Sequence, residues 1–183
     1  MYLMKTLIMI SGYAGSGKDT MGVYLARKWG YRRLAFADQL KDEASRIYGI
    51  HRHLMDTADG KRACVVVNGI QRSVRDVLVE YGTKCRSKSL QYFVNPVIDE
   101  IVRNEQEKFV ITDWRYENEY IAIKRRFGDQ IRLVTVRINR FAKPLYKSKS
   151  ETQLDRFPFD VVVENTSSMN ALMVKIDDLI DLY

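Results

Sequence analysis

The sequence predicts an α/β fold of three layers, in which a central, mostly parallel five-stranded sheet carries helices on both faces. Short apolar runs alternate along the chain with segments of helical periodicity, which is the pattern of repeated strand–helix units. The 183 residues are 46% hydrophobic, and no internal repeat or linker rich in proline, glycine and serine divides them. We therefore expect one domain over residues 1–183.

The individual elements follow from the spacing of apolar residues and from glycine and proline breaks. Strands are expected at 6–10, 31–36, 109–112, 131–138 and 161–163. Helices are expected at 18–29, 38–48, 73–81, 90–106 and 117–127. A final helix closes the chain, because apolar residues from Met169 to Ile180 recur at spacings of three and four. The segment 49–71 shows no clear periodicity.

The composition favours small anionic partners over nucleic acid and membranes. A net charge of +7 attracts anions, but the 30 lysines and arginines are spread along the chain, with no basic tail and no nucleic-acid-binding motif. The apolar run at the start breaks at Ser11 and Gly12, and no stretch approaches the roughly 18 apolar residues of a membrane span. We therefore expect a cytoplasmic protein with neither a nucleic-acid nor a membrane partner.

Chemistry enters at the junction between the first strand and the first helix, where residues 12–20 read GYAGSGKDT and match the pattern GxxxxGK. Glycines let successive backbone N–H groups point at phosphate oxygens, the helix N-terminus adds partial positive charge, and Lys18 reaches the β and γ phosphates. The motif predicts a P-loop NTPase fold that binds ATP and Mg²⁺. The residues expected to hold the nucleotide are Gly12, Ala14, Gly15, Ser16, Gly17, Lys18, Asp19 and Thr20.

Three residues are candidate magnesium ligands. Asp19 follows the lysine, where a Ser or Thr hydroxyl normally touches magnesium, and the hydroxyl comes next, at Thr20. A carboxylate there can bind a hard cation directly or through water, or it can balance the charge of Lys18 or cap the helix. Asp113 ends an apolar run, and ligands of open α/β sheets bind beyond the carboxyl ends of the strands. We expect it to act as a Walker-B acid, with capping of the next helix as the alternative role.

The most basic stretch of the chain, at 137–156, predicts a lid at about 137–157. Phosphoryl transfer needs neutralisation of the phosphate oxygens, and mobile arginines that close over the nucleotides supply it while excluding water. Arg137 and Arg140 are the candidate lid arginines, and Arg115 is a candidate for the transferring phosphate. A solvated loop cation is the alternative for each of them. The residues expected to be catalytic are Lys18, Asp113, Arg115, Arg137 and Arg140.

The loop GYAGSGKDT resembles the P-loop of bacteriophage-type deoxynucleoside-monophosphate kinases, which are relatives of the adenylate-kinase-like enzymes. Further segments resemble the same family in the same order: LAFADQLK, SVRDVL followed by EYGT, ITDWRYENE, the pair Ser150–Glu151, and DVVVEN. The resemblance implies an acceptor-binding region at about 38–106, a glycine–threonine turn at its centre, and a contact of Asn165 with the cofactor. The acceptor-binding residues that it implies are Asp38, Lys41, Arg75, Gly82, Thr83 and Arg86.

The expected reaction transfers the γ-phosphate of ATP to a deoxynucleoside monophosphate, giving a deoxynucleoside diphosphate and ADP. No general base is required, because a monophosphate oxygen is already anionic at neutral pH. The family further implies a homodimer and, for a viral protein, work in the host cytoplasm.

Two alternatives remain open. The DxR and DxVxxN patterns also resemble those of phosphomevalonate and dephospho-coenzyme A kinases, so the acceptor can be another small phosphorylated molecule. The net charge also suits a P-loop protein that binds nucleotide and nucleic acid without transferring phosphate to a small molecule.

Overall fold

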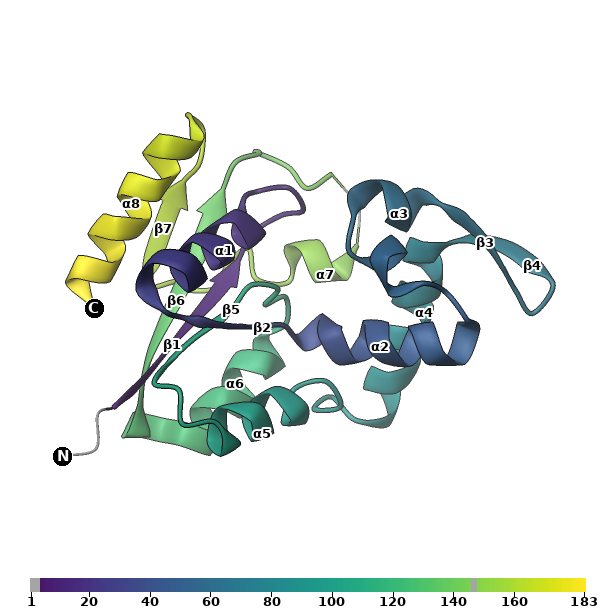
Figure 1. Ribbon diagram of the computed structural model, residues 1–183, viewed down its shortest axis with the longest axis horizontal. Helices are drawn as coiled ribbons and strands as arrows, with labels where there is room; N and C mark the ends of the chain where they lie inside the picture. Colours follow the sequence, from purple (N-terminus) through teal and green to yellow (C-terminus); the bar gives the residue numbers. More distant parts are fainter. Residues whose placement is uncertain (1–3, 146–147) are drawn as a thin grey trace. The chain divides into compact units, whose positions relative to one another are not determined.

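The computed structural model describes residues 4–145 and 148–183 (Figure 1). These residues form two compact units. The first, which we call the sheet unit, runs to Ala35 and resumes at Ile98; the second, the inserted unit, spans Phe36–Val97. The acceptor-binding region expected at 38–106 falls mostly in the inserted unit, and the P-loop falls in the sheet unit.

The sheet unit is built on five parallel strands in the order β2-β5-β1-β6-β7. Their bounds are Lys5–Ser11 for β1, Arg32–Leu34 for β2, Lys108–Ile111 for β5, Ile131–Asn139 for β6 and Val161–Glu164 for β7. The predicted α/β fold with a five-stranded sheet is therefore confirmed. Because all strands run the same way, their carboxyl ends lie at one edge of the sheet, where ligands of such folds bind.

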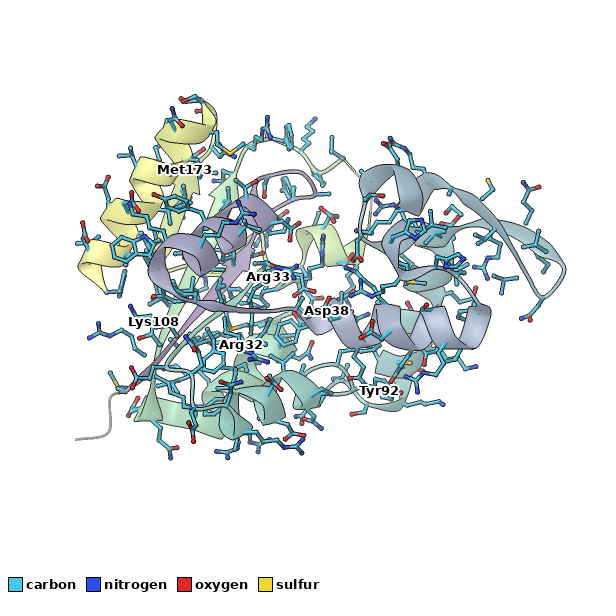
Figure 2. All side chains as sticks on the ribbon, in the orientation of Figure 1. Arg32, Arg33, Asp38, Tyr92, Lys108 and Met173 are labelled. Atoms are coloured by element: carbon cyan, nitrogen blue, oxygen red, sulfur yellow. The ribbon has the colours of Figure 1, made fainter. Side chains whose placement is uncertain are left out.

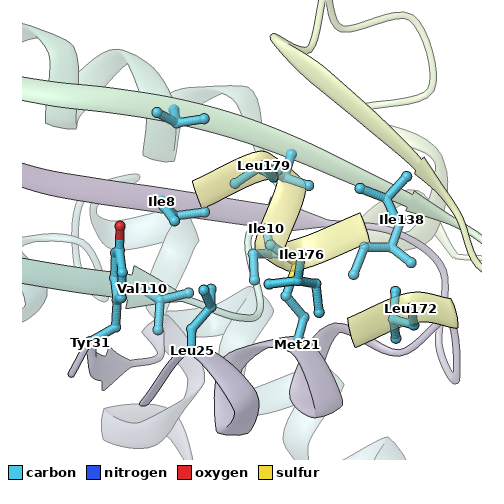
Figure 3. Packing of buried hydrophobic residues seen from close by; sticks show 13 residues of the cluster. Ile8, Ile10, Met21, Leu25, Tyr31, Val110, Ile138, Leu172, Ile176 and Leu179 are labelled. Carbon is cyan, nitrogen blue, oxygen red and sulfur yellow. The ribbon is translucent and has the colours of Figure 1, made fainter. Parts of the chain in front are cut away.

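Helices cover both faces of this sheet. Helix α1 (Lys18–Trp29) connects β1 to β2 in one direction across the sheet, and α6 (Glu117–Phe127) connects β5 to β6 in the other. Since such crossovers are right-handed, the two helices lie on opposite faces. Helix α8 (Met169–Leu182) packs beside α1. Buried hydrophobic residues of α1 and α8 pack with those of the sheet in one cluster (Figure 3), whose labelled members are Ile8, Ile10, Met21, Leu25, Tyr31, Val110, Ile138, Leu172, Ile176 and Leu179.

The inserted unit consists of short elements and two longer helices. They are α2 (Phe36–Tyr48), η1 (Arg52–Met55), α3 (Ala58–Arg62), β3 (Cys64–Val67), β4 (Ile70–Ser73) and α4 (Val74–Lys88). The β3–β4 hairpin turns at Asn68 and Gly69, which both have positive φ (53° and 77°), as a two-residue primed turn requires. Helix α5 (Asn95–Arg103) leads back to the sheet unit, which also contains η2 (Gly128–Gln130) and α7 (Lys149–Thr152).

Several predicted boundaries are wrong. Strand β2 ends at Leu34, because Phe36 is buried as the first residue of α2. Helix α5 begins at Asn95 and not at Leu90, with Pro96 in the first turn, where a missing N–H costs little. The short elements within 49–71 gave no periodic signal because each spans five residues or fewer.

The glycine–threonine turn expected at Gly82 and Thr83 is also wrong, because α4 continues through both residues to Lys88. The Thr83 hydroxyl donates to the Val79 carbonyl (2.8 Å) one helical turn earlier. A Cβ at Gly82 would lie in ordinary van der Waals contact with the Leu40 side chain (3.6 Å), so Gly82 faces α2 within a continuous helix.

Within the described part of the chain, no helix combines the length and the apolar composition that crossing a membrane requires.

Candidate phosphate-binding site

The P-loop, residues 12–18, joins β1 to α1 in a tight curl. A Cβ at Gly12, where φ is +147°, would lie 2.4 Å from the Ile138 carbonyl oxygen and 2.6 Å from Ser16 Oγ. Gly17 precedes the helix with φ +108°, and a Cβ there would lie 2.7 Å from Asn165 Nδ2. Glycine is therefore required at both positions, for backbone conformation and for space.

Lys18 lies buried at the base of this loop. Its Nζ donates to the carbonyl oxygens of Gly12 and Tyr13, both at 2.7 Å. Burial lowers the pKa of Lys18 to about 8, and the positive charge of Arg115 adds to the shift, while Glu151 and other nearby carboxylates oppose it. The ammonium is thus held inside the loop, as a phosphate-binding lysine must be.

Two segments from the far half of the chain brace the loop. The Asn165 side-chain amide donates to the Ser16 carbonyl (2.8 Å), and its backbone N–H donates to Asn139 (2.7 Å). Arg140 donates from Nη1 to the Gly15 carbonyl (3.3 Å), and Phe141 lies 3.6 Å from a Cβ built at Gly15. Asn165 therefore supports the loop backbone, and Arg140, a predicted lid arginine, lies directly on it.

The candidate magnesium ligands lie at the ends of β1 and β5. Asp19 is in the first turn of α1, with an exposed side chain 3.3 Å from the guanidinium of Arg33 (labelled in Figure 2). Thr20 follows it in α1, and Asp113 follows β5 at the carboxyl edge of the sheet. Among the described residues, no three His, Cys, Asp or Glu side chains gather as a metal site. A magnesium ion here would therefore take most of its remaining ligands from nucleotide phosphates and water.

The polar interior of the site fits a bound phosphate and metal. Ser16 Oγ and Thr112 Oγ1 are buried and have no hydrogen-bond partner among the described residues, and Ser16 belongs to the loop itself. Unpaired buried hydroxyls are rare in folded proteins and usually mark a missing partner. Together with the glycine-built curl, they agree with a nucleotide phosphate and its Mg²⁺ in this loop.

Arg115 meets a residue that the sequence analysis missed. Its Nη1 contacts Glu151 Oε1 of α7 in an ion pair and donates to the Ser150 carbonyl (3.2 Å). Oε2 of Glu151 accepts the backbone N–H of Ala14 in the P-loop at 2.8 Å, and its side chain is only 4% exposed. In the sequence, Ser150 and Glu151 match a closing segment of the resembled family and lie within the most basic stretch of the chain, but no role was predicted for Glu151.

Arg137 lies in strand β6, at 7% exposure, and not in a loop. It pairs with Asp155 at 2.7 Å and stacks on the Tyr13 ring, with 4.7 Å between guanidinium carbon and ring centroid. The lid expected at 137–157 therefore begins inside the sheet, and its residues 146 and 147 lie outside the described residues. A cavity of about 570 Å³ beside the loop is lined by Tyr13, Arg137, Asn139, Arg140, Phe141 and Glu164, among others.

Asp38 and Lys41 belong to a charge cluster within the inserted unit. Arg52 binds Asp38 (labelled in Figure 2; 2.8 Å), Asp42 (2.9 Å) and Asp56, while Lys41 Nζ lies 2.9 Å from Asp56. Both predicted acceptor ligands therefore have partners of opposite charge in this structure.

Arg75 and Arg86 both lie on α4, close to three turns apart. They therefore share one face of the helix, separated by about 16 Å along its axis. The Arg86 guanidinium lies 5.1 Å from the Phe93 ring centroid, and its Nη1 is 2.9 Å from a Cβ built at Gly82. A single phosphate could contact both arginines only if the two side chains leaned toward each other.

A scan against protein-family models found no match, and a search of curated proteins found no similar sequence. Solved structures do match over nearly the whole chain. The APS kinase of Mycobacterium tuberculosis in complex with AMPPNP and APS aligns with a TM-score of 0.53 at 11% identity, over 98% of this chain and 99% of that one. A gluconokinase from Sinorhizobium meliloti aligns with a TM-score of 0.52 at 16% identity, over 99% and 95%.

A third solved structure, TT1252 from Thermus thermophilus, aligns with a TM-score of 0.51 at 20% identity, over 98% of each chain. At these identities the likeness shows the fold and nothing finer. This chain has the fold of the P-loop kinases.

Proposed function

We propose that this protein is an ATP-dependent kinase that transfers the γ-phosphate to a deoxynucleoside monophosphate. The P-loop supports this most directly, since it combines a glycine-built curl, a buried Lys18 and a Ser16 hydroxyl without a partner in the described part of the chain, all at the carboxyl edge of a parallel sheet. Such a loop binds the phosphates of a nucleotide through backbone N–H groups and the lysine. Arg115 and Arg140 add two further cations beside it.

In this proposal, each residue of the sheet unit has a physical task. Lys18, Arg115 and Arg140 neutralise phosphate oxygens as charge redistributes, and positioning with charge stabilisation supplies the rate. Asp19, Thr20 and Asp113 would hold Mg²⁺, which screens the phosphates when bound. Arg137, stacked on Tyr13, shapes the cavity beside the loop.

The inserted unit supplies the acceptor contacts in this proposal. Lys41, Arg75 and Arg86 carry the positive charge that a monophosphate needs, and the family resemblance points to a deoxynucleotide. The separation of the two arginines along α4 favours two contact points on the acceptor over a joint clamp on one phosphate. A homodimer and a cytoplasmic location stay predictions.

A different small acceptor is the second candidate, and the fold comparisons support it, since the matched structures include kinases of APS and gluconate by name. Phosphomevalonate and dephospho-coenzyme A are further candidate acceptors, because of the DxR and DxVxxN patterns described above. The choice between them depends on the inserted unit and not on the P-loop.

The test is coupled ADP release with Mg-ATP against dAMP, dGMP, dCMP, dTMP, phosphomevalonate, dephospho-coenzyme A, APS and gluconate, each beside a reaction without acceptor. We expect release with one or more deoxynucleotides. Lys18→Ala should lower it by about a thousandfold or more, because the charge on the transferring phosphate loses its buried partner.

The matched control is Lys124→Ala, which removes an exposed lysine of α6 and should leave turnover unchanged. Turnover of Lys18→Ala at the wild-type rate would refute the P-loop assignment. Release with only the other acceptors would refute the deoxynucleotide and keep the kinase. Silence with every acceptor, together with salt-sensitive DNA binding, would favour the nucleic-acid-binding alternative.

A further inference from the structure

The carboxylate of Glu151 occupies a position at the P-loop where a phosphate is expected. One of its oxygens accepts the Ala14 N–H at 2.8 Å, and the other contacts the guanidinium of Arg115. Both partners are groups that bind phosphate in loops of this kind: an inward-pointing backbone amide and an arginine. The Glu151 side chain is 4% exposed and that of Arg115 is 28% exposed, so the carboxylate is desolvated while its cation partner keeps some contact with solvent.

The two anions compete at the Ala14 amide, which has a single N–H to donate, and for the charge of Arg115. A buried carboxylate is tolerated only while its charge is compensated, and Glu151 is compensated by the Ala14 N–H, the Arg115 guanidinium and the nearby Lys18 ammonium. If a phosphate takes over this amide and this guanidinium, Glu151 is left buried beside further negative charge. It must then leave the loop.

Lys18 also makes hydrogen bonds to the protein itself. Its ammonium donates to two carbonyls of its own loop, at Gly12 and Tyr13, both at 2.7 Å. The loop therefore has its main cation and one of its amides engaged by the protein itself. Because an ammonium has three N–H donors, Lys18 can add a phosphate contact to these two, whereas the Ala14 amide must exchange Glu151 for a phosphate.

We propose that Glu151 is an internal competitor for nucleotide phosphate, which holds the P-loop in a self-occupied state until Mg-ATP displaces it. The inference rests on the proposed binding of ATP to this loop. Glu151 sits in α7, which spans only Lys149–Thr152, so its release moves a short segment of the predicted lid region. Displacement of the carboxylate thus couples nucleotide binding to a rearrangement of that region.

The size of the effect follows from a population argument. When only a fraction of the protein has its binding groups available, the apparent dissociation constant rises by the inverse of that fraction. Glu151→Gln keeps an oxygen that can accept the Ala14 N–H but removes the charge that pairs with Arg115. We expect this variant to bind Mg-ATP about tenfold more tightly than wild type, the scale of one charge-assisted hydrogen bond.

The experiment is calorimetric titration of the full-length protein with Mg-ATP. Glu105→Gln is the matched control, because it makes the same change in net charge at an exposed position of the sheet unit and should bind as wild type does. Tighter binding by Glu151→Gln alone supports the proposal. Binding by this variant that equals or falls below that of wild type overturns it and indicates that Glu151 positions Arg115 and the loop.

A second measurement uses wild-type protein and does not depend on how the variant folds. Hydrogen exchange of residues 148–155 should become faster on saturation with Mg-ATP, because α7 loses its contact with the loop. Unchanged or slower exchange overturns the proposal. If wild type and Glu151→Gln both fail to bind Mg-ATP, the proposed function itself fails; if wild type binds and the variant binds no more tightly, only this inference fails.

Discussion

The two regions that carry the predicted phosphate contacts use different chemical groups. In the P-loop, the contacts come from backbone amides and one buried lysine, held by glycines that tolerate no Cβ at Gly12 and Gly17. In the inserted unit, they come from long side chains on α2 and α4. Lys41 pairs with Asp56, and the neighbouring Asp38 pairs with Arg52, within a cluster of partly exposed charges.

This difference explains why the local sequence predicts the P-loop contacts more reliably than those of the inserted unit. A backbone-built site needs particular residues at fixed spacing, because steric exclusion leaves no other choice. A site built from exposed side chains needs only charges, and any one of those charges can be explained equally well by a salt bridge. Substitutions should therefore have large, position-specific effects in the P-loop and small, condition-dependent effects in the inserted unit.

The largest effect is expected at Gly12. Gly12→Ala places a Cβ 2.4 Å from the Ile138 carbonyl oxygen at φ +147°, so we expect a loss of about 3 kcal/mol in the free energy of unfolding and no measurable Mg-ATP binding. Gly30→Ala is the matched control: φ is +72°, but no atom of residues 4–145 or 148–183 beyond its chain neighbours lies within 4 Å of its Cβ, so a loss of about 1 kcal/mol is expected. Urea unfolding measures the free energy of unfolding of both variants. Equal losses of stability in the two variants would contradict this prediction, because the crowding around the Cβ at Gly12 would then have no effect.

The next effect is the pH dependence of Mg-ATP binding. Burial, with the charge of Arg115 second, lowers the pKa of Lys18 to about 8, so the ammonium is charged below this pH and neutral above it. We expect the dissociation constant to be flat near pH 7 and to rise about tenfold per pH unit well above 8. Lys18→Arg should bind more weakly but lose this slope, since arginine stays charged.

The same shift in the pKa of Lys18 acts on the ligand-free protein with a definite sign. Between about pH 8 and 10.5 the unfolded chain binds the proton that folded Lys18 releases, so stability rises with pH relative to a Lys18→Met variant. If the dissociation constant for Mg-ATP still rises with pH above 8 in Lys18→Arg, the pH dependence of binding comes from another group.

The smallest effect is expected in the inserted unit. Arg52→Gln removes the hydrogen bonds to Asp38, Asp42 and Asp56, and because the cluster is partly exposed we expect a loss of only about 1 kcal/mol at pH 7. Partial burial alone would raise the pKa of the Asp56 carboxyl, but hydrogen bonds from Arg52 and Lys41 outweigh it and hold the pKa below 3.8.

The contribution of Asp56 is therefore present above its ordinary pKa and lost as the pH falls through the lowered folded value. Urea unfolding at pH 7 and at pH 3 should show the difference between wild type and Arg52→Gln shrinking in acid. Arg103→Gln, which removes a single exposed pair with Asp99 at 3.9 Å, should change stability by less than about 0.5 kcal/mol at either pH. A constant difference for Arg52→Gln across this range would contradict the role of Asp56.

Particular elements show how far prediction from the sequence could go. The helices at Lys18–Trp29 and Glu117–Phe127 were predicted with the observed bounds, since their periodicity and end signals are local. Helix α4 was cut short at Gly82, because a glycine inside a helix has the same letter as one that ends a helix. Arg137 fell both in the strand expected at 131–138, which β6 confirms, and at the start of the expected lid, because a run of basic residues does not show where the strand ends and the loop begins.

The sequence by itself determined the α/β class, the P-loop and the position of Lys18, because each depends on residues close together in the chain. Only the tertiary structure decided that Glu151 meets Ala14 and Arg115, and that Asn165 braces Ser16. These contacts join the end of β1 to segments after β5, β6 and β7, and so they depend on the strand order of the sheet. Periodicity and motif spacing describe neighbours along the chain, whereas packing at a sheet edge brings together residues that share no local pattern.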